Sequence, residues 1–350
     1  MNGFGITRSI PMLCEAREKK RGHNWSIELL IFLLVFLTGS ILESIPVTIG
    51  TCIWLFGQEN IMGIAIESAA NNDMSAYFDK LSDIASNMPS WIMIVTLFAT
   101  VLLTLTCIFF CRWVEKRRVP SMGLRRHNAV MEYIVGALMG IVLVALSIIL
   151  CVFTGGIAEV SLKQFDIGLL ALYLIGYMIQ GMSEEVACRG YLMVSMTRRN
   201  PVWLSVILSS AMFSLLHIAN PGFGLMPFVN IFLTGLVFGV YVLKRGNLWG
   251  ACAMHSFWNF FVGNVFGISV SGTKLSENTT ILQTAVGGGA DLWTGGEFGL
   301  EGSLCVTIVM IAALAIELFV MPAADDGRFD APVPASDAEF STPAQDIIAE

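Results

Sequence analysis

The stretch 182–192 carries the side chains of this sequence whose types and spacing can do chemistry. It reads Met-Ser-Glu-Glu-Val-Ala-Cys-Arg-Gly-Tyr-Leu and places ionisable groups in surroundings apolar enough for lipid. On a helix, Glu185 and Arg189 are four residues apart and share a face, so they can form a structural ion pair. Glu184 points about 100° away from that pair and is left without a cation. A carboxylate of this kind in an apolar cavity suits a general base acting near neutrality.

Two histidines and an amide extend the set of candidate residues. His217 and His255 both lie inside apolar stretches, and Asn259 follows His255 by four residues, so the last two share a helix face. Phe213 precedes His217 by one helical turn and is expected to pack against its ring. A single buried histidine is more often a hydrogen-bonded packing residue, and the Glu185 pair can equally be structural. Two histidines together with a carboxylate and an amide favour a shared polar cavity.

The elements that position these residues are predicted to be membrane helices. The sequence is 55% hydrophobic and 13% charged, with a mean hydropathy of +0.72, which exceeds the range of soluble domains. We predict an all-α polytopic membrane protein with an intramembrane polar site. Glu28 and Glu43 interrupt the first span and are interpreted as interfacial or packing carboxylates, Glu43 also being a candidate to line a cavity. About eight spans are expected, at 25–42 with a broken continuation to 56, 91–111, 129–153, 167 onward, 202–218, 227–243, 248–266 and 303–321.

Charge sets the expected orientation and the domain boundaries. Basic clusters near 8–21, 112–126, 198–199 and 244–245 place both termini in the cytoplasm of a multi-pass plasma-membrane protein. The net charge is −7, of which −6 lies in the segment 323–350, so no nucleic-acid partner is implied. Eight cysteines, mostly within apolar spans, form no disulfide framework. The expected organisation is a basic cytoplasmic tail (1–24), two helices with an outer loop (25–119), a core (120–322) and a disordered acidic tail (323–350).

Peptide hydrolysis is one reaction that the candidate residues can support. Glu184 and His217 could polarise a water molecule, while His255 and Asn259 could donate hydrogen bonds to the tetrahedral oxyanion. Alternatively, Glu184, His217 and His255 have the ligand types of a catalytic zinc site. The sequence contains neither HExxH nor GxSxG, so the zinc interpretation rests on residue type alone. Cys188, beside Arg189, is interpreted as a packing residue.

Three motifs follow one another along the chain: Glu184-Glu185-x-x-x-Arg189, Phe213-x-x-x-His217 and His255-x-x-x-Asn259. Together they resemble the CPBP family of intramembrane endopeptidases, which includes type II CaaX prenyl proteases and bacteriocin-processing and immunity-associated proteins. The resemblance covers about 120–322 and includes softer features, among them Asn230 and the segment 294–301. It implies that Glu184 and His217 activate water and that His255 and Asn259 stabilise the oxyanion. Family members are often labelled metalloproteases, and a glutamate-activated water without metal is also proposed.

Three functions stay open on the sequence alone. The first is an intramembrane peptidase that cleaves membrane-associated proteins or peptides within the lipid bilayer. The second is a proton- or ion-coupled transporter, because buried glutamate and histidine also form proton relays. The third is an inactive immunity or scaffold protein. One geometric conflict also remains, because Glu184 is expected near the cytoplasmic end of its helix and His217 about 24 Å from that side. We expect the fourth helix to run on toward Thr197, or the fifth to begin before Pro201.

Overall fold

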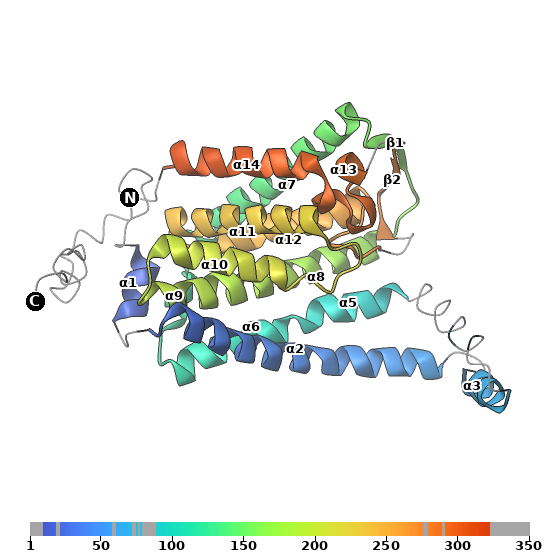
Figure 1. Cartoon of the computed structure of the whole chain (residues 1–350), viewed down its shortest axis with the longest axis horizontal. Coiled ribbons are helices and arrows are strands. Elements are labelled where there is room, and N and C mark those ends of the chain that lie inside the picture. Colours follow the sequence, from blue (N-terminus) through green and yellow to red (C-terminus); the bar gives the residue numbers. More distant parts are fainter. Residues whose placement is uncertain are drawn as a thin grey trace, which may run out of the picture.

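The chain folds into a bundle of helices that run side by side along the long axis of the molecule (Figure 1). The computed structural model describes residues 10–18, 22–57, 61–71, 75, 78, 89–275, 279–288 and 291–322. Helices dominate these residues, which confirms the predicted all-α membrane fold class. The expected acidic tail, 323–350, and most of the predicted outer loop between the first two spans lie outside the described residues.

Five helices in the described ranges are long and apolar enough to cross a membrane. These are α2 (Trp25–Phe56); α5 (Ser90–Ala99), α6 (Val101–Phe109) and the π-helical turn Phe110–Val114; α7 (Ala129–Phe153); α8 (Ile167–Glu185), the π-helical segment Val186–Met193 and α9 (Val194–Thr197); and α11 (Leu225–Arg245). The other predicted spans contain α10 (Val202–Leu215), α12 (Trp249–Phe260) with the π-helical turn Phe261–Val265, and α14 (Leu304–Phe319). A helix thus lies at every predicted position, but the count of eight membrane spans is not confirmed.

The course of the fourth membrane helix resolves the conflict between the expected membrane depths of Glu184 and His217. It continues past Glu184 to Thr197, as the first of the two expectations required. The fifth span was predicted over 202–218, but α10 ends at Leu215 and His217 lies in the turn that follows. Glu184 lies 13 residues before Thr197 and His217 lies 15 residues after the start of α10. At 1.5 Å per residue both are about 20 Å from the turn that joins the two helices.

The first span is one continuous helix instead of the broken one that the sequence suggested. α2 keeps Pro46 inside it and lies against α5 and α6. Gly39 permits this close approach, because a Cβ atom at that position would lie 2.5 Å from Leu103 Cδ1. Membrane helices associate through small residues of this kind, which let two backbones come near each other. α2 therefore packs onto the rest of the bundle at the middle of its length.

Glycines also bring α7 against α12. A Cβ atom at Gly136 would collide with the Gly250 backbone, and one at Gly140 with the Met254 backbone. Gly181 of α8 approaches Ser256 in the same way. α12 is therefore held between α7 and α8, and this position orients the helix that carries His255.

The two ends of the bundle contain structure that the sequence did not predict. At one end, α1 (Pro11–Arg17) buries Met12, Leu13 and Ala16, so this part of the expected N-terminal tail is packed. At the other end, β1 (Ile157–Leu162) pairs antiparallel with β2 (Leu282–Val286), next to α13 (Asp291–Thr294). The remaining helix, α3 (Ile61–Ala70), lies beyond the end of α2 (Figure 1).

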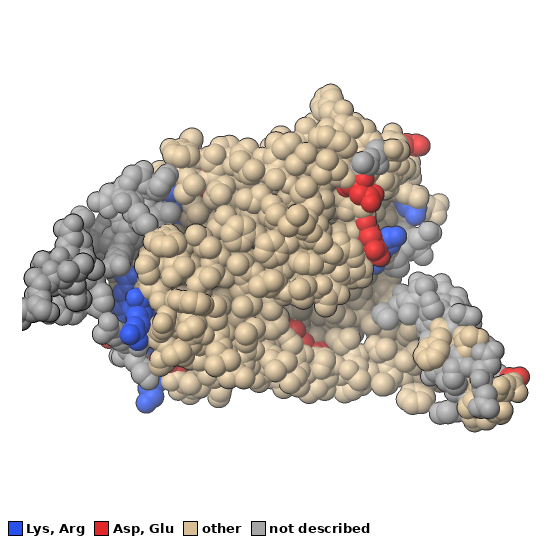
Figure 2. All heavy atoms as spheres, in the orientation of Figure 1, with Lys and Arg blue, Asp and Glu red and all other residues tan. Residues whose placement is uncertain are grey.

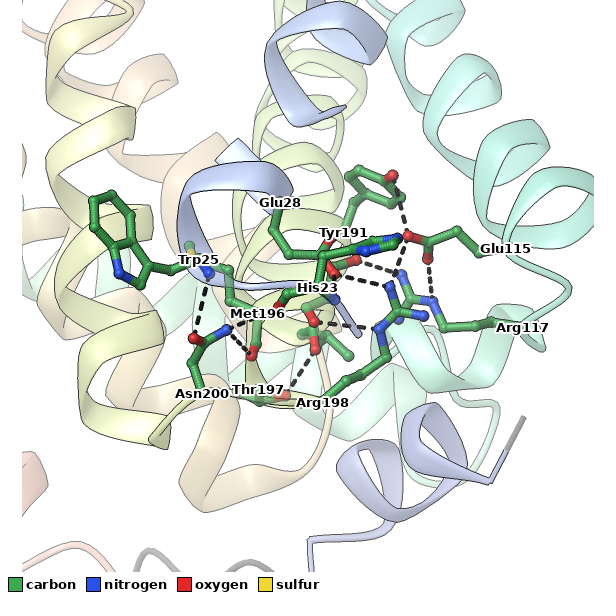
Figure 3. A network of polar contacts seen from close by, with 12 residues as sticks. His23, Trp25, Glu28, Glu115, Arg117, Tyr191, Met196, Thr197, Arg198 and Asn200 are labelled. Atoms are coloured by element: carbon green, nitrogen blue, oxygen red, sulfur yellow. Dashed lines mark hydrogen bonds and ion pairs between the residues drawn. The ribbon is translucent and has the colours of Figure 1, made fainter. Parts of the chain in front are cut away.

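Basic side chains gather at the end of the molecule where α1 and α9 lie (Figure 2). Inside that end, Arg198 bonds Glu28 Oε1 at 3.2 Å and Glu115 Oε1 at 2.9 Å. Arg117 Nε bonds Glu115 Oε2 at 2.6 Å (Figure 3). These four residues, called the basic-end network below, join the start of α2 to the end of α9 and the segment after α6. Each of their charges has an opposite partner.

Candidate active site

Glu184 and Glu185 lie where α8 changes into the π-helical segment Val186–Met193. Single π-helical turns inside α-helices occur frequently at functional sites, because the wider turn redirects the neighbouring side chains. The segment 186–193 is fully buried between helices, so its altered turn fixes the orientation of the side chains on it. No residue pattern in the sequence predicted this change of helix type.

Glu185 and Arg189 form the predicted ion pair. Arg189 Nη1 bonds Glu185 Oε1 at 2.8 Å, and both side chains are fully buried. The guanidinium also lies over two rings, with its Cζ 4.2 Å from the centroid of Phe213 and 5.4 Å from that of Phe238. Arginine stacks favourably on aromatic faces in desolvated sites. The charge of Glu185 is therefore compensated, and its carboxylate is held in one place.

His255 lies between the two glutamates. Its Nδ1 is 3.0 Å from Glu185 Oε1, and its Nε2 is 3.8 Å from Glu184 Oε2. Because a carboxylate accepts, Nδ1 carries the proton in the first contact. Phe213 and Phe238 pack against the imidazole, with ring centroids 5.9 Å and 5.6 Å away. The ring is thus oriented by Glu185 and presents its second nitrogen to Glu184.

Asn259 reaches Glu184 through a residue that the sequence did not single out. Asn259 Nδ2 donates to Gln180 Oε1 at 2.9 Å, and Gln180 Nε2 donates to Glu184 Oε1. Gln180 precedes Glu184 by four residues, so the two side chains share a helix face. That spacing is the signal that could have identified Gln180. One carboxylate oxygen of Glu184 is therefore fixed by an amide.

His217 approaches the site from the turn after α10. Its Nδ1 lies 2.8 Å from the Phe213 carbonyl oxygen. A carbonyl only accepts, so Nδ1 donates, and Nε2 of the neutral ring is left as an acceptor. The predicted contact with Phe213 is present, at 5.1 Å between ring centroids in an edge-to-face arrangement. The protonation pattern of His217 therefore leaves a nitrogen that can take a proton.

A cavity of about 180 Å³ brings Glu184 and His217 together between α2, α6, α8 and α10. Glu43 of α2 also lines it, as the sequence allowed. On the face of the molecule shown in Figure 2, acidic atoms are visible in a hollow midway along the bundle, away from either charged end. Glu184 Oε2 and Glu43 Oε1 are buried and have no hydrogen-bond partner within the described part of the chain. The other lining residues are Phe36, Thr100, Leu103, Ser183, Ala187, Cys188, Phe213, Leu216 and Asn220.

The candidate residues meet Glu184 from two sides. His217 shares the cavity with it, whereas His255 approaches it directly and Asn259 through Gln180, and neither of these two lines the cavity. In the described ranges, no group of three His, Cys, Asp or Glu side chains is placed to hold a metal ion. Zinc binding by Glu184, His217 and His255 stays a prediction.

The fold and the polar site define a multi-pass membrane protein with buried ionisable groups around a small cavity. Residues 166–261 match the family model described as type II CAAX prenyl endopeptidase Rce1-like. No curated protein and no solved structure matches the chain. The chain therefore carries an Rce1-like domain, which confirms the resemblance seen in its motifs. The match supports a CAAX-type intramembrane endopeptidase, and it contains Glu184, Glu185, Arg189, Phe213, His217, His255 and Asn259.

Proposed function

We propose that this protein hydrolyses peptide bonds of membrane-associated CaaX-type substrates with a water molecule activated by Glu184 and His217. One observation carries the proposal: Glu184, which has a buried oxygen without a hydrogen-bond partner in the described chain, lines the same cavity as His217. A buried acceptor without a partner is unfavourable unless water or a ligand supplies a donor. Water bound there would lie between a carboxylate and an imidazole nitrogen, both of which accept protons.

The proposed reaction assigns a role to each neighbouring group. The water oxygen attacks the carbonyl carbon, and its proton passes to Glu184 or to His217 Nε2. His255, protonated on both nitrogens, donates from Nδ1 to Glu185 and from Nε2 toward the developing oxyanion. Asn259, after exchanging its contact with Gln180, supplies a second donor. Each such donor contributes roughly 3 to 4 kcal/mol to stabilising the transition state. Glu185 and Arg189 hold His255 in position, and the leaving amine takes up a proton.

The basic end supports an orientation of the protein in its membrane. Lys and Arg side chains gather near α1 and α9 (Figure 2), and membrane proteins keep such residues in the cytoplasm. We place that end, with both termini, on the cytoplasmic side of a plasma membrane. Substrate segments reach the cavity near the middle of the bundle, where acidic atoms are visible in a hollow between the charged ends of the molecule (Figure 2). Processing of bacteriocin or leader peptides would use the same chemistry on a different substrate.

Cleavage of a farnesylated CaaX peptide by the purified protein in lipid nanodiscs tests the proposal. We expect wild type to release the terminal tripeptide, detected by mass spectrometry, and Glu184→Ala to release none while keeping its melting temperature. Equal cleavage by both proteins would overturn the role of Glu184. Absence of cleavage, combined with pH-gradient-driven flux in liposomes, would instead indicate a transporter. Parallel reactions with EDTA, together with metal analysis of the purified protein, test the zinc hypothesis.

A further inference from the structure

Glu43 reaches the candidate site from a helix outside the Rce1-like segment 166–261. It follows Phe36 by seven residues, which is two helical turns, and both side chains line the cavity. Gly39 lies between them on the same face, where α2 meets Leu103 of α6. The close contact of α2 with α6 at Gly39 therefore carries Glu43 to the cavity wall.

Glu43 and Glu184 form a pair of carboxylates with one buried oxygen each that lacks a hydrogen-bond partner in the described ranges. They line the same cavity and interact electrostatically. Among the described residues that line it, none is Lys or Arg. Two carboxylates that face one poorly solvated space do not both ionise easily, and such pairs share a proton.

The surroundings of the two groups decide which of them holds that proton. Glu184 accepts a hydrogen bond from Gln180 and lies 3.8 Å from the His255 ring, and both contacts stabilise a negative charge. Glu43 has the backbone of Leu103 as a neighbour that favours its charged form, and in the part of the chain that the structure describes no Lys or Arg lines the cavity beside it. The negative charge therefore rests on Glu184, and the shared proton rests on Glu43.

We propose that Glu43 is a second acid–base residue of this site, which donates the proton that the departing amine needs. The inference rests on the proposed function. Water forms the new C–O bond and gives its proton to Glu184, either directly or through His217 Nε2. The C–N bond then breaks, and the nitrogen keeps the electron pair and takes the proton of Glu43. The proton on Glu184 returns to Glu43 through a cavity water, so the starting state is restored without any further reactant.

Other titratable groups face Glu43 from the helices packed against α2. Glu184 and Cys188 come from α8 and its π-helical continuation, and His217 comes from the turn after α10. Cys107 of α6 also interacts with Glu43. Glu184 and His217 also have proton-transfer roles in the proposed reaction, so the test must separate them from Glu43. An amide at position 43 does so, because it keeps the shape and a hydrogen-bond donor but cannot release a proton.

The test compares Glu43→Gln with wild type on the farnesylated CaaX peptide, in nanodiscs, across pH. We expect kcat to fall about 100-fold, as for loss of a general acid, while KM stays within about twofold. The alkaline limb of the kcat profile, which reports loss of the Glu43 proton, should disappear. Ser44→Ala, an exposed neighbour on the same helix, is the matched control and should behave as wild type.

Glu43→Asp serves as the second variant and should retain the alkaline limb with a smaller loss in kcat, because the carboxyl group is kept. Wild-type kcat and an unchanged pH profile in Glu43→Gln would overturn the inference. The same outcome would leave the proposed function intact as long as wild type cleaves and Glu184→Ala does not. If Glu43→Gln does not fold, loss of the alkaline limb in Glu43→Asp would also overturn the inference.

Discussion

Two buried clusters of charged side chains in the described part of the bundle differ in the partners of their carboxylates. In the basic-end network, Arg198 is bonded to two glutamates and Arg117 to one of them (Figure 3). At the candidate site, Arg189 compensates Glu185, but Glu184 and Glu43 have no Lys or Arg partner within the described chain. The unpaired carboxylates face a cavity of about 180 Å³. Both clusters are buried, and each has a carboxylate oxygen without a hydrogen-bond partner, Glu28 Oε2 in the network and Glu184 Oε2 at the site. Of these two carboxylates, Glu184 is the one that lines the cavity and has no Lys or Arg partner in the described chain.

This difference separates a structural role from a chemical one. Breaking a buried ion pair leaves an uncompensated charge and destabilises the fold. Removing a carboxylate that has no cationic partner leaves no charge uncompensated and should change the stability of the fold little. Its loss should instead lower the rate of the reaction. Substitutions in the basic-end network should therefore change stability, and substitutions at the cavity should change catalysis. Four substitutions test this comparison, ordered by the size of the expected effect.

The largest effect is expected for His217→Gln. It removes the nitrogen that can accept the proton of water, while the amide can keep a hydrogen bond to the Phe213 carbonyl. We expect kcat on the farnesylated CaaX peptide to fall about 1,000-fold, with an unchanged melting temperature. His23→Gln, beside the basic-end network, is the control and should retain wild-type kcat. Full activity of His217→Gln would show that Glu184 activates the water alone.

Arg198→Met should have the next largest effect, on stability. It leaves Glu28 and Glu115 without their shared cation, which should destabilise the protein by about 3 kcal/mol. Thermal unfolding in detergent measures this change. Activity per folded molecule should match that of wild type, because the network lies at the end of the bundle. A loss of kcat equal to that of His217→Gln would mean that the two clusters are not separate in function.

Gln180→Leu should have an intermediate effect on the reaction. It removes the donor to Glu184 and the acceptor for Asn259 while keeping the volume of the side chain. A hydrogen bond to a charged group contributes about 1.5–3 kcal/mol, so kcat should fall at least tenfold. The control is Gln283→Leu in β2, on the sheet at the far end, which should leave kcat unchanged. Wild-type kcat in Gln180→Leu would show that Gln180 has no role in the reaction.

Ser195→Ala should produce the smallest change. Ser195 accepts a hydrogen bond from Arg117 Nη2 at 3.0 Å, and Arg117 keeps its bond to Glu115 in the variant. We expect a loss of about 1 kcal/mol in stability and no change in kcat. A stability loss as large as that of Arg198→Met would contradict this expectation. It would show that the network depends on hydroxyl contacts more than on its ion pairs.

Local spacing in the sequence predicted the contacts made within one helix. The Glu185–Arg189 ion pair and the Phe213–His217 ring contact both follow from residues four apart, and both are present. Gln180 has the same spacing from Glu184 but was not predicted, because a neutral amide in a membrane helix indicates a functional site less strongly than a charge does. Asn230 was noted only as a soft feature, yet its amide bonds the Glu301 and Ser303 carbonyl oxygens across the fold.

Contacts between distant helices could not be read from spacing. The place of Glu43 on the cavity wall depends on the approach of α2 to α6 at Gly39, which joins residues far apart in the chain. The π-helical segment Val186–Met193 depends on packing around it, since propensities do not distinguish it from an α-helix. The buried α1 was missed because its basic residues suggested a free tail, although its apolar face packs inside. Tertiary packing decided each of these features.

Crystals grown in a lipid mesophase, diffracting well enough to place water molecules, would test the shared cavity directly. We expect one ordered water within about 2.6–3.2 Å of both Glu184 Oε2 and His217 Nε2. Such a water would occupy the position from which the proposed attack begins. A dry cavity, or a Glu184 carboxylate and a His217 ring turned toward separate neighbours with no common water, would contradict the hydrolytic centre.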